Sequence, residues 1–162
     1  MNIGIISDTH DNIALCQRAL QRFQELQVSL IIHCGDICQP STVELFRVIP
    51  THFVLGNNDD ERELVPAIAG IGGHCHGLIG ELTLAHKNLA WVHGHLDSDF
   101  RTIKRSGKYD YLFFGHSHRA EYYQFGSTTV INPGALRSVR RKTCGTLNLD
   151  SDHWNEIILD EI

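Results

Sequence analysis

The sequence NIGIISDTHDN, residues 2–12, joins a short apolar run to a cluster of polar residues. An Ile-rich run of this length, ended by polar residues, is typical of a buried strand. Asp11 or Asn12 is then placed to cap a helix. The apolar residues that follow recur every three or four positions, as one face of a helix requires: Ile13, Cys16, Leu20, Phe23 and Leu26. The sequence therefore predicts a strand, a polar turn and a helix in succession.

The same alternation continues to residue 56. SLIIHCG (29–35) and THFVLG (51–56) are further apolar runs that predict strands. Between them, Ser41 and Glu44 form a capping box that predicts a short helix to about Val48. Strands that alternate with helices in this way indicate parallel pairing through right-handed crossovers. The acidic and glycine-rich segment after Asp60 is expected to hold only a brief helix and otherwise loop.

The second half is richer in strand patterns. ELTLAH (81–86) and LAWVHG (89–94) predict a hairpin that turns at Lys87 and Asn88, and residues 98–106 predict a helix that starts at Ser98. Five more strand-like segments follow: YDYLFFG (109–115), AEYYQFG (120–126), TTVIN (128–132), CGTLNLD (144–150) and EIILDEI (156–162). A second half so rich in strand-like segments favours a mixed sheet or a two-sheet α/β sandwich. With no repeat or linker in the sequence, we expect one domain, residues 1–162.

Composition excludes several classes of protein. The sequence has no apolar run of about 18 residues, so no membrane span is expected. It also has no basic segment before its first apolar run, so no signal peptide is expected, and its five scattered cysteines indicate reduced thiols and a cytoplasmic location. The net charge of −5 argues against nucleic acid as a partner. A local basic patch keeps a nuclease as an alternative: Arg137, Arg140, Arg141 and Lys142.

Polar residues with the chemistry for catalysis follow five separate apolar runs. They are Asp8 and His10, Asp36, Asn57, His93 and His95, and His116 and His118. Ligands of open α/β sheets bind beyond the carboxyl ends of the strands, so these residues are expected to meet. In extended backbone, residues two apart share a face, which predicts that Asp8 and His10 point the same way. The same reasoning applies to His116 and His118.

Carboxylate, amide and imidazole donors without thiolate suit Mn²⁺, Fe, Ni²⁺ or Zn²⁺. This set is too large for one ion and suits two ions that share a carboxylate. Two ions about 3.5–4 Å apart clamp a phosphoryl group and lower the pKa of a water molecule. Any one of these motifs is more often a surface turn, but their joint placement after five apolar runs predicts a hydrolase of phosphate esters.

The ordered motifs DTHDN (8–12), GD (35–36), GNND (56–59), HGH (93–95) and GHSH (115–118) resemble those of the calcineurin-like metallophosphoesterase superfamily. The small size and INPGA (131–135) resemble its YfcE-like phosphodiesterase branch. The resemblance implies a four-layer α/β/β/α sandwich of two mixed sheets flanked by helices. It also implies in-line attack on phosphorus by a metal-bridging hydroxide, without a covalent intermediate.

The resemblance further assigns the ligands of two divalent ions. Asp8, His10 and His118 would hold the first ion. Asn57, His93 and His116 would hold the second, with Asp36 bridging both. Mn²⁺ is the expected metal, with Ni²⁺, Fe²⁺ and Zn²⁺ as alternatives.

One position departs from larger members of the superfamily, which carry a proton-donating histidine where this chain has Asn58. A neutral amide does not titrate, so we expect a preference for diesters with acidic leaving groups, with Asn58 in contact with a phosphoryl oxygen. His95 is the candidate substitute for proton donation or phosphate contact. Asp59 is expected to orient Asn58 or a ligand histidine. His74 and His76, in a glycine-rich segment, are candidates to approach the substrate.

The main alternative is a non-catalytic binding scaffold of the same fold, as in the retromer subunit that resembles this superfamily. The complete ligand set argues against it. We therefore expect a phosphodiesterase that acts on a small phosphate ester, with self-association left open. The loops carry no recognisable signature that indicates the physiological substrate.

Overall fold

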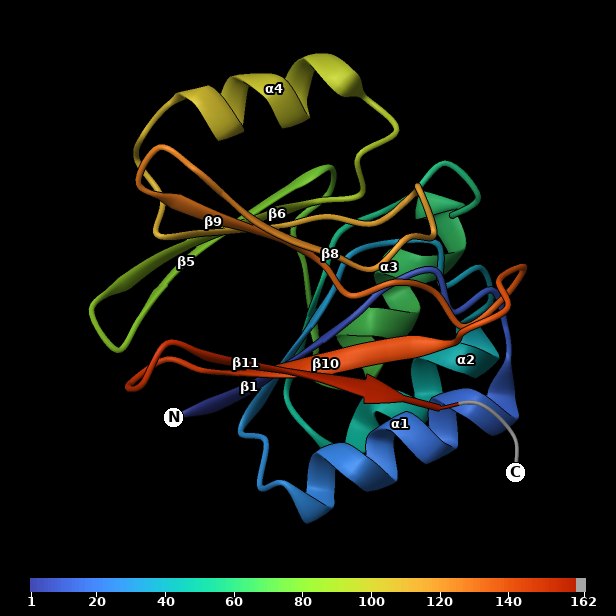
Figure 1. Cartoon of the computed structure of the whole chain (residues 1–162). Helices are drawn as coiled ribbons and strands as arrows, with labels where there is room; N and C mark the ends of the chain where they lie inside the picture. Colours follow the sequence, from blue (N-terminus) through green and yellow to red (C-terminus); the bar gives the residue numbers. More distant parts are fainter. Residues whose placement is uncertain (160–162) are drawn as a thin grey trace.

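In the computed structural model, which describes residues 1–159, two mixed β-sheets lie face to face and helices cover their outer surfaces (Figure 1). The first sheet contains, in spatial order, β11 (His153–Ile158), β10 (Thr143–Asn148), β1 (Asn2–Ile6), β2 (Leu30–His33), β3 (Thr51–Phe53) and β4 (His74–Cys75). The second contains β5 (Ile79–Leu84), β6 (Lys87–Val92), β7 (Tyr111–Phe113), β9 (Thr128–Asn132) and β8 (Glu121–Phe125).

Three helices lie along the first sheet: α1 (Ile13–Glu25), α2 (Pro40–Leu45), which runs into the 3₁₀ turn η1 (Phe46–Val48), and α3 (Glu61–Gly70). A fourth, α4 (Asp97–Arg105), covers the second sheet on the opposite side of the molecule (Figure 1). This arrangement confirms the expected four-layer α/β/β/α sandwich. No helix within residues 1–159 is long and apolar enough to cross a membrane.

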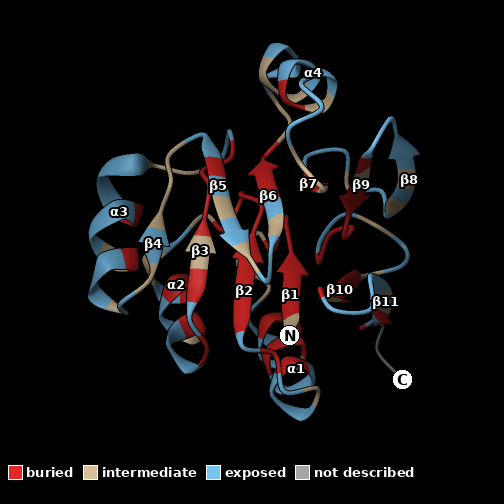
Figure 2. Ribbon diagram, turned by 90° about the vertical axis from the view of Figure 1, so that its left-hand side faces the viewer, coloured by how far each residue is buried: buried red, intermediate tan, exposed pale blue. Residues whose placement is uncertain are grey.

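Each interface between layers has its own apolar core. Ile3 and Ile5 of β1 face the second sheet and pack in a cluster with Trp91 of β6 and Phe113 of β7. Phe23 of α1 belongs to the core beneath the helices, and a third cluster lies under α4. Strands β1 and β2 are therefore buried over nearly their whole length, as Figure 2 shows.

Strand direction brings the loops of interest to one edge. β1 pairs in parallel with β2, and β2 with β3, so the carboxyl ends of these three strands meet. In the second sheet, β7 pairs in parallel with β6 and with β9. The antiparallel neighbours β10 and β8 make both sheets mixed. The parallel strands supply the edge at which ligands of α/β proteins bind.

Two helix predictions were wrong in detail. Helix α2 begins at Pro40 with Gln39 as N-cap and no capping side chain, so Ser41 forms no capping box. Proline is favoured at the first helical position because it needs no hydrogen-bond partner there. Helix α3 runs over ten residues instead of a brief turn, because Asp60 caps it and Leu64 and Ile68 bury one face.

The bounds of other helices and strands also differ from the predictions. The hairpin turns at Ala85 and His86, whose φ angles of 47° and 62° fit the type I′ turn favoured between twisted strands. Lys87 and Asn88, the predicted turn, lie in β6. Helix α4 starts at Asp97, one residue before the prediction, and β11 starts at His153, three before it. The last predicted strand residues, 160–162, lie outside the described part of the chain.

Candidate metal centre

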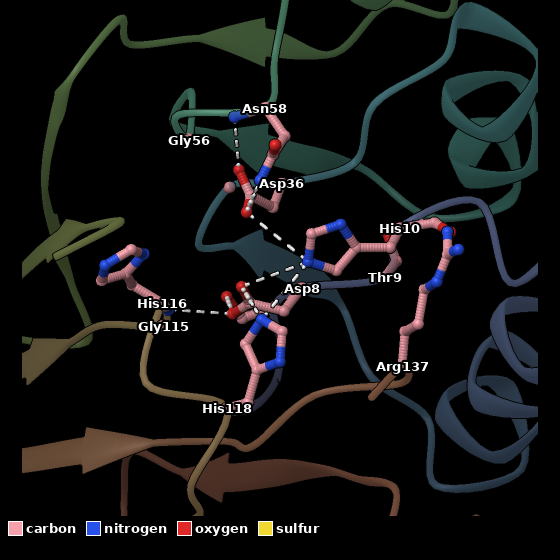
Figure 3. Close-up of polar contacts among 12 residues, drawn as sticks. Asp8, Thr9, His10, Asp36, Gly56, Asn58, Gly115, His116, His118 and Arg137 are labelled. Carbon is pink, nitrogen blue, oxygen red and sulfur yellow. Dashed lines mark hydrogen bonds and ion pairs between the residues drawn. The ribbon is translucent and has the colours of Figure 1, made fainter. Parts of the chain in front are cut away.

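The polar residues predicted from the sequence meet at the carboxyl ends of β1, β2, β3, β6 and β7. Figure 3 shows His10 and His118 turned toward Asp8, with Asp36 on the next loop. Backbone hydrogen bonds tie these loops together: Asp8 N donates to Gly35 O at 3.0 Å and His10 N to Asp36 O at 3.0 Å. On the second sheet, Gly115 N donates to His93 O at 2.9 Å. Backbone hydrogen bonds therefore hold neighbouring loops at this edge together.

The backbone at the site is not extended. Asp8, His10 and Asp36 have φ angles of 51°, 41° and 58°, and those of His116 and His118 are 63° and 58°. The expectation that extended chain aligns residues two apart was therefore wrong, although Asp8 and His10 do converge. Left-handed backbone is costly for residues other than glycine, and it concentrates at functional sites where the surroundings impose it.

The first group of side chains is Asp8, His10 and His118. Asp8 Oδ1 lies 3.1 Å from His118 Nε2 and 3.7 Å from His10 Nε2. The two imidazole nitrogens are 3.3 Å apart. The other oxygen of Asp8 accepts hydrogen bonds from Ser7 Oγ at 2.5 Å and from His116 N at 3.0 Å. These bonds fix the Asp8 carboxylate with Oδ1 facing the imidazoles.

The second group combines Asp8, Asp36 and His93, all buried. Asp36 Oδ2 lies 3.3 Å from His93 Nε2 and 3.5 Å from His10 Nε2, so this carboxylate lies between the two groups. His93 donates from Nδ1 to Cys34 O at 2.8 Å, which leaves Nε2 as the nitrogen facing Asp36. Asn57 Oδ1 is 3.2 Å from the same Nε2.

His116 lies at the margin of this arrangement. Its ring centroid is 5.2 Å from that of His93, and its side chain is on the other side of Asp8 from His10 (Figure 3). The structure thus places all seven predicted ligands around the paired carboxylates of Asp8 and Asp36. Which residues bind an ion stays a prediction.

The pKa shifts show a site that attracts positive charge. Burial acts to raise the pKa of Asp8, but contacts with His10, His93 and Ser7 hold it below its usual value. Asp36 behaves alike: burial is outweighed mainly by His93, and its pKa is lowered. The contact with Asp8 raises the pKa of His10, and the carboxylates raise that of His93 despite its burial. A cation at the imidazole nitrogens would meet the same favourable field.

One atom tests whether a metal suits the site. Asp8 Oδ1 is fully buried and accepts no hydrogen bond from any described residue. A buried ionised oxygen without a hydrogen bond is costly, unless a cation compensates it. The nearby donors are carboxylate oxygens, an amide oxygen and imidazole nitrogens, the set that Mn²⁺, Fe²⁺, Ni²⁺ and Zn²⁺ accept. The residues present therefore fit a transition-metal site.

Asn58 and Asp59 both hold the loop that carries Asp36, and the expected contact of Asn58 with a phosphoryl oxygen stays a prediction. Asn58 donates from Nδ2 to Asp36 Oδ2 at 2.8 Å and from its backbone N–H to Oδ1 at 3.0 Å. Among the described residues, the Asp59 carboxylate makes no hydrogen bond to Asn58 or to a ligand histidine, so the expectation that it orients one of them was wrong. Its carboxylate instead accepts from the backbone N–H groups of Asp36, Cys38 and Gly56, each at 2.8 Å. Asp59 thereby fixes the loop that carries Asp36.

His95 lies beside the second group, with its ring centroid 5.4 Å from that of His93 and 6.3 Å from that of His116. His95 Nδ1 is buried and has no hydrogen-bond partner among residues 1–159. His74 and His76 lie elsewhere: their rings stack on His52 at 4.7 and 5.0 Å, outside both carboxylate–histidine groups.

Several residues that orient or contact the site residues were not predicted from the sequence. Ser7 orients Asp8, and buried Asn132 donates to Gly115 O and Ser117 Oγ, both at 3.0 Å, which holds the loop of His116 and His118. Cys38 Sγ lies 3.6 Å from His10 Nδ1. Ser7 and Asn132 are polar residues at the ends of apolar runs, and this signal was available. Nothing in the local sequence indicates the contact of Cys38.

The chain matches a known protein family over nearly its whole length. The calcineurin-like phosphoesterase superfamily domain matches residues 1–152. Phosphodiesterase MJ0936 of Methanocaldococcus jannaschii is 30% identical over 99% of this chain and 100% of its own length. The solved structure of an archaeal phosphodiesterase is 29% identical, with a TM-score of 0.92, and the match covers 98% of this chain and 100% of that one.

A more distant structure shows the fold alone. Vps29 of Entamoeba histolytica, solved in complex with Zn²⁺, is 18% identical over 99% of this chain and 100% of its own, with a TM-score of 0.72. The family match over residues 1–152 and the relative of 30% identity show a shared family in addition to a shared fold. The chain belongs to the calcineurin-like phosphoesterase superfamily, as its ordered motifs implied.

Proposed function

We propose that this protein is a metal-dependent phosphodiesterase that acts on a small phosphate ester. The observation that carries the proposal is Asp8 Oδ1, a buried carboxylate oxygen without a hydrogen bond that faces the imidazoles of His10 and His118. Membership of the superfamily and the phosphodiesterase relative support the reaction class.

In this proposal two divalent ions bind, Mn²⁺ first among the candidates. Asp8, His10 and His118 would hold one, Asn57, His93 and His116 the other, and Asp36, between His10 and His93, would be shared. Such ions act as Lewis acids on a phosphoryl oxygen and lower the pKa of water, which supplies a nucleophile at neutral pH.

The chain's own residues prepare this chemistry. Ser7 and the N–H of His116 fix the Asp8 carboxylate, and Asn58 fixes both oxygens of Asp36. The hydrogen bond from His93 Nδ1 to Cys34 O leaves Nε2 as the nitrogen directed at the site. Ligands held in this way need little rearrangement on binding, which favours both affinity and rate.

Protonation of the leaving group is assigned to His95. The half-buried imidazole lies beside His93 and His116, and its Nδ1 has no partner among the described residues. Asn58 cannot supply a proton because its amide does not titrate. A weak proton donor matters little when the leaving group is acidic, so the proposal includes a preference for such diesters.

The proposed location is the cytoplasm. All five cysteines are free thiols, three of them buried, which suits a reducing compartment. Nothing in the overall charge favours nucleic acid, and a net charge of −5 repels it.

The proposal is tested with bis(p-nitrophenyl) phosphate. Protein stripped with a chelator is expected to be inactive and to regain hydrolysis with Mn²⁺, Ni²⁺ or Zn²⁺. Asp8→Asn keeps the size of the side chain but removes its charge, and it is expected to abolish the recovery. A folded wild-type protein that binds these metals and hydrolyses no diester would contradict the proposal and favour a binding scaffold.

A further inference from the structure

Arg137 begins a basic segment that the proposed reaction leaves without a role. The backbone just before it is fixed to the site on both sides. Leu136 is fully buried, its N–H donates to Asp8 O at 3.1 Å, and its carbonyl accepts from Asn12 Nδ2 at 2.9 Å. The Arg137 side chain therefore starts from a rigid point next to Asp8.

The guanidinium lies beside His10. Arg137 Nη1 donates to His10 O at 3.3 Å (Figure 3), and the residue is exposed. Within residues 1–159 this is its only hydrogen bond, and no carboxylate lies close enough to form an ion pair with it. The guanidinium is planar and carries five N–H donors, so most remain to bind two oxygens of an anion such as phosphate.

The surrounding charge favours a strongly anionic group. The protein as a whole carries a charge of −5, yet Arg137, Arg140, Arg141 and Lys142 fall within six consecutive residues. Arg141 is paired with Glu156, whereas Arg137 lies beside the backbone of His10 without such a partner among the described residues. Arg137 thus supplies a positive charge beside His10 that no carboxylate among the described residues pairs with, and such a charge attracts anions to that side.

His10 separates Arg137 from the reacting centre. Its carbonyl accepts from Arg137, whereas its Nε2 faces Asp8 and Asp36 at 3.7 and 3.5 Å. A group bound by Arg137 would therefore lie across His10 from a phosphoryl group held at the carboxylates and would be distinct from it. We propose that Arg137 binds a second phosphate on the substrate, so that the preferred substrates are phosphodiesters whose non-leaving alcohol is itself phosphorylated.

This inference rests on the proposed phosphodiesterase function. Two matched esters test the binding of a second phosphate by Arg137 separately from the phosphodiesterase activity. Both are p-nitrophenyl esters of thymidine 5′-phosphate, one with a free 3′-hydroxyl and one with a 3′-phosphate. For the Mn²⁺-loaded wild-type enzyme, the 3′-phosphate is expected to lower KM by about tenfold, the equivalent of one charge-assisted hydrogen bond of about 1.4 kcal/mol. Arg137→Gln should remove this preference and leave kcat for the simpler ester unchanged.

Two further variants control for charge. Arg137→Lys keeps the charge without the planar fork and should retain part of the preference. Arg22→Gln removes a cation from an exposed position of α1, where Arg22 pairs with Glu25, and should retain the whole preference. If Arg137→Gln keeps the wild-type ratio of KM values, the inference is wrong while the phosphodiesterase proposal stands.

Failure of the proposed function gives a different result, because neither ester would then be hydrolysed. Calorimetric binding of thymidine 3′,5′-bisphosphate to the same proteins then decides the role of Arg137. Weaker binding to Arg137→Gln than to wild type and Arg22→Gln supports it, and equal binding to all three overturns it.

Discussion

Asn58 holds both oxygens of Asp36: its side-chain amide donates to Oδ2 at 2.8 Å and its backbone N–H to Oδ1 at 3.0 Å. The resemblance of the sequence motifs implied a proton-donating histidine at this position in many larger members of the superfamily. In this chain the residue orients a carboxylate at the centre of the site instead. The position thus contributes to the arrangement of the charged groups and cannot supply a proton.

Asn58→Ala removes the side-chain donor and keeps the backbone bond. Hydrogen bonds to charged groups contribute about 1.5–3 kcal/mol, so we expect kcat/KM for bis(p-nitrophenyl) phosphate to fall about tenfold or more. Mn²⁺ affinity, measured by calorimetric titration, should weaken as well. Asn155→Ala, on an exposed position of β11, is the matched control and should change neither quantity. Equal kinetics for Asn58→Ala and wild type would remove the role given to Asn58.

His95 should matter most for poor leaving groups. Burial and the neighbouring His93 and His116 lower the pKa of His95, so its protonated form predominates only below pH 6.5. His95→Gln should keep its metals and lose rate about 10²-fold with an alkyl leaving group, but little with p-nitrophenol. With the alkyl diester, wild-type kcat should fall as pH rises through the lowered pKa, and the variant should lack this limb. Identical profiles for the two proteins would exclude His95 as the donor.

Gly56 must remain glycine for the Asp36 loop to keep its shape. A Cβ at Gly56 would lie 2.0 Å from Asp36 Oδ1 and 2.6 Å from Asp36 N, so the loop must move. We expect Gly56→Ala to weaken Mn²⁺ binding and diester hydrolysis by at least tenfold. At Gly70, the last residue of α3, a Cβ meets nothing within 4 Å. Gly70→Ala should therefore leave activity unchanged, and comparable losses in both variants would refute the explanation.

His33 makes stability depend on pH. The residue is fully buried, accepts from Gly35 N at 3.1 Å through Nδ1, and lies 3.2 Å from Thr9 Oγ1 through Nε2. Burial lowers the pKa of His33 from 6.5 to about 3. Below pH 6.5 the unfolded chain binds a proton that the folded chain excludes, so the free energy of unfolding falls as pH drops toward 3.

At pH 5 this effect amounts to about 2 kcal/mol. His33→Gln should be less stable than wild type at pH 7, but it should lose less stability between pH 7 and pH 5. Urea unfolding at both pH values measures the difference, with exposed His153→Gln as control. The same loss in wild type and His33→Gln would show that another group causes the pH dependence.

Much of the site was predictable because its residues directly follow buried strands. Asp8, Asp36 and His93 were identified from that pattern alone, since the carboxyl ends of parallel strands meet. The detailed conformation was not predictable. Asp8 and His10 adopt left-handed backbone through bonds such as His10 N to Asp36 O, which join residues far apart in the sequence. The local sequence does not indicate hydrogen-bond partners that lie so far away along the chain.

The fold, like the site, was predictable from the sequence only in part. The order of strands and helices favoured a mixed sheet or a two-sheet α/β sandwich, and the family resemblance implied the four layers, whereas neither indicated the length of α3. Pro66 indicates a break when read locally, yet it is exposed within α3 while Leu64 and Ile68 pack on the core. Tertiary burial outweighed the local penalty of proline. The role of Asp59 was also hidden, because its three backbone partners come together only in the folded chain.

The central claim is a two-ion centre that shares Asp36, and metal stoichiometry tests it most directly. Stripped protein is reconstituted with Mn²⁺, freed of excess metal and analysed for bound manganese, with circular dichroism as the check on folding. Wild type is predicted to retain about two equivalents and folded Asp36→Ala fewer than one, because both ions lose a ligand. Two equivalents in Asp36→Ala, or fewer than one in wild type, would contradict the claim.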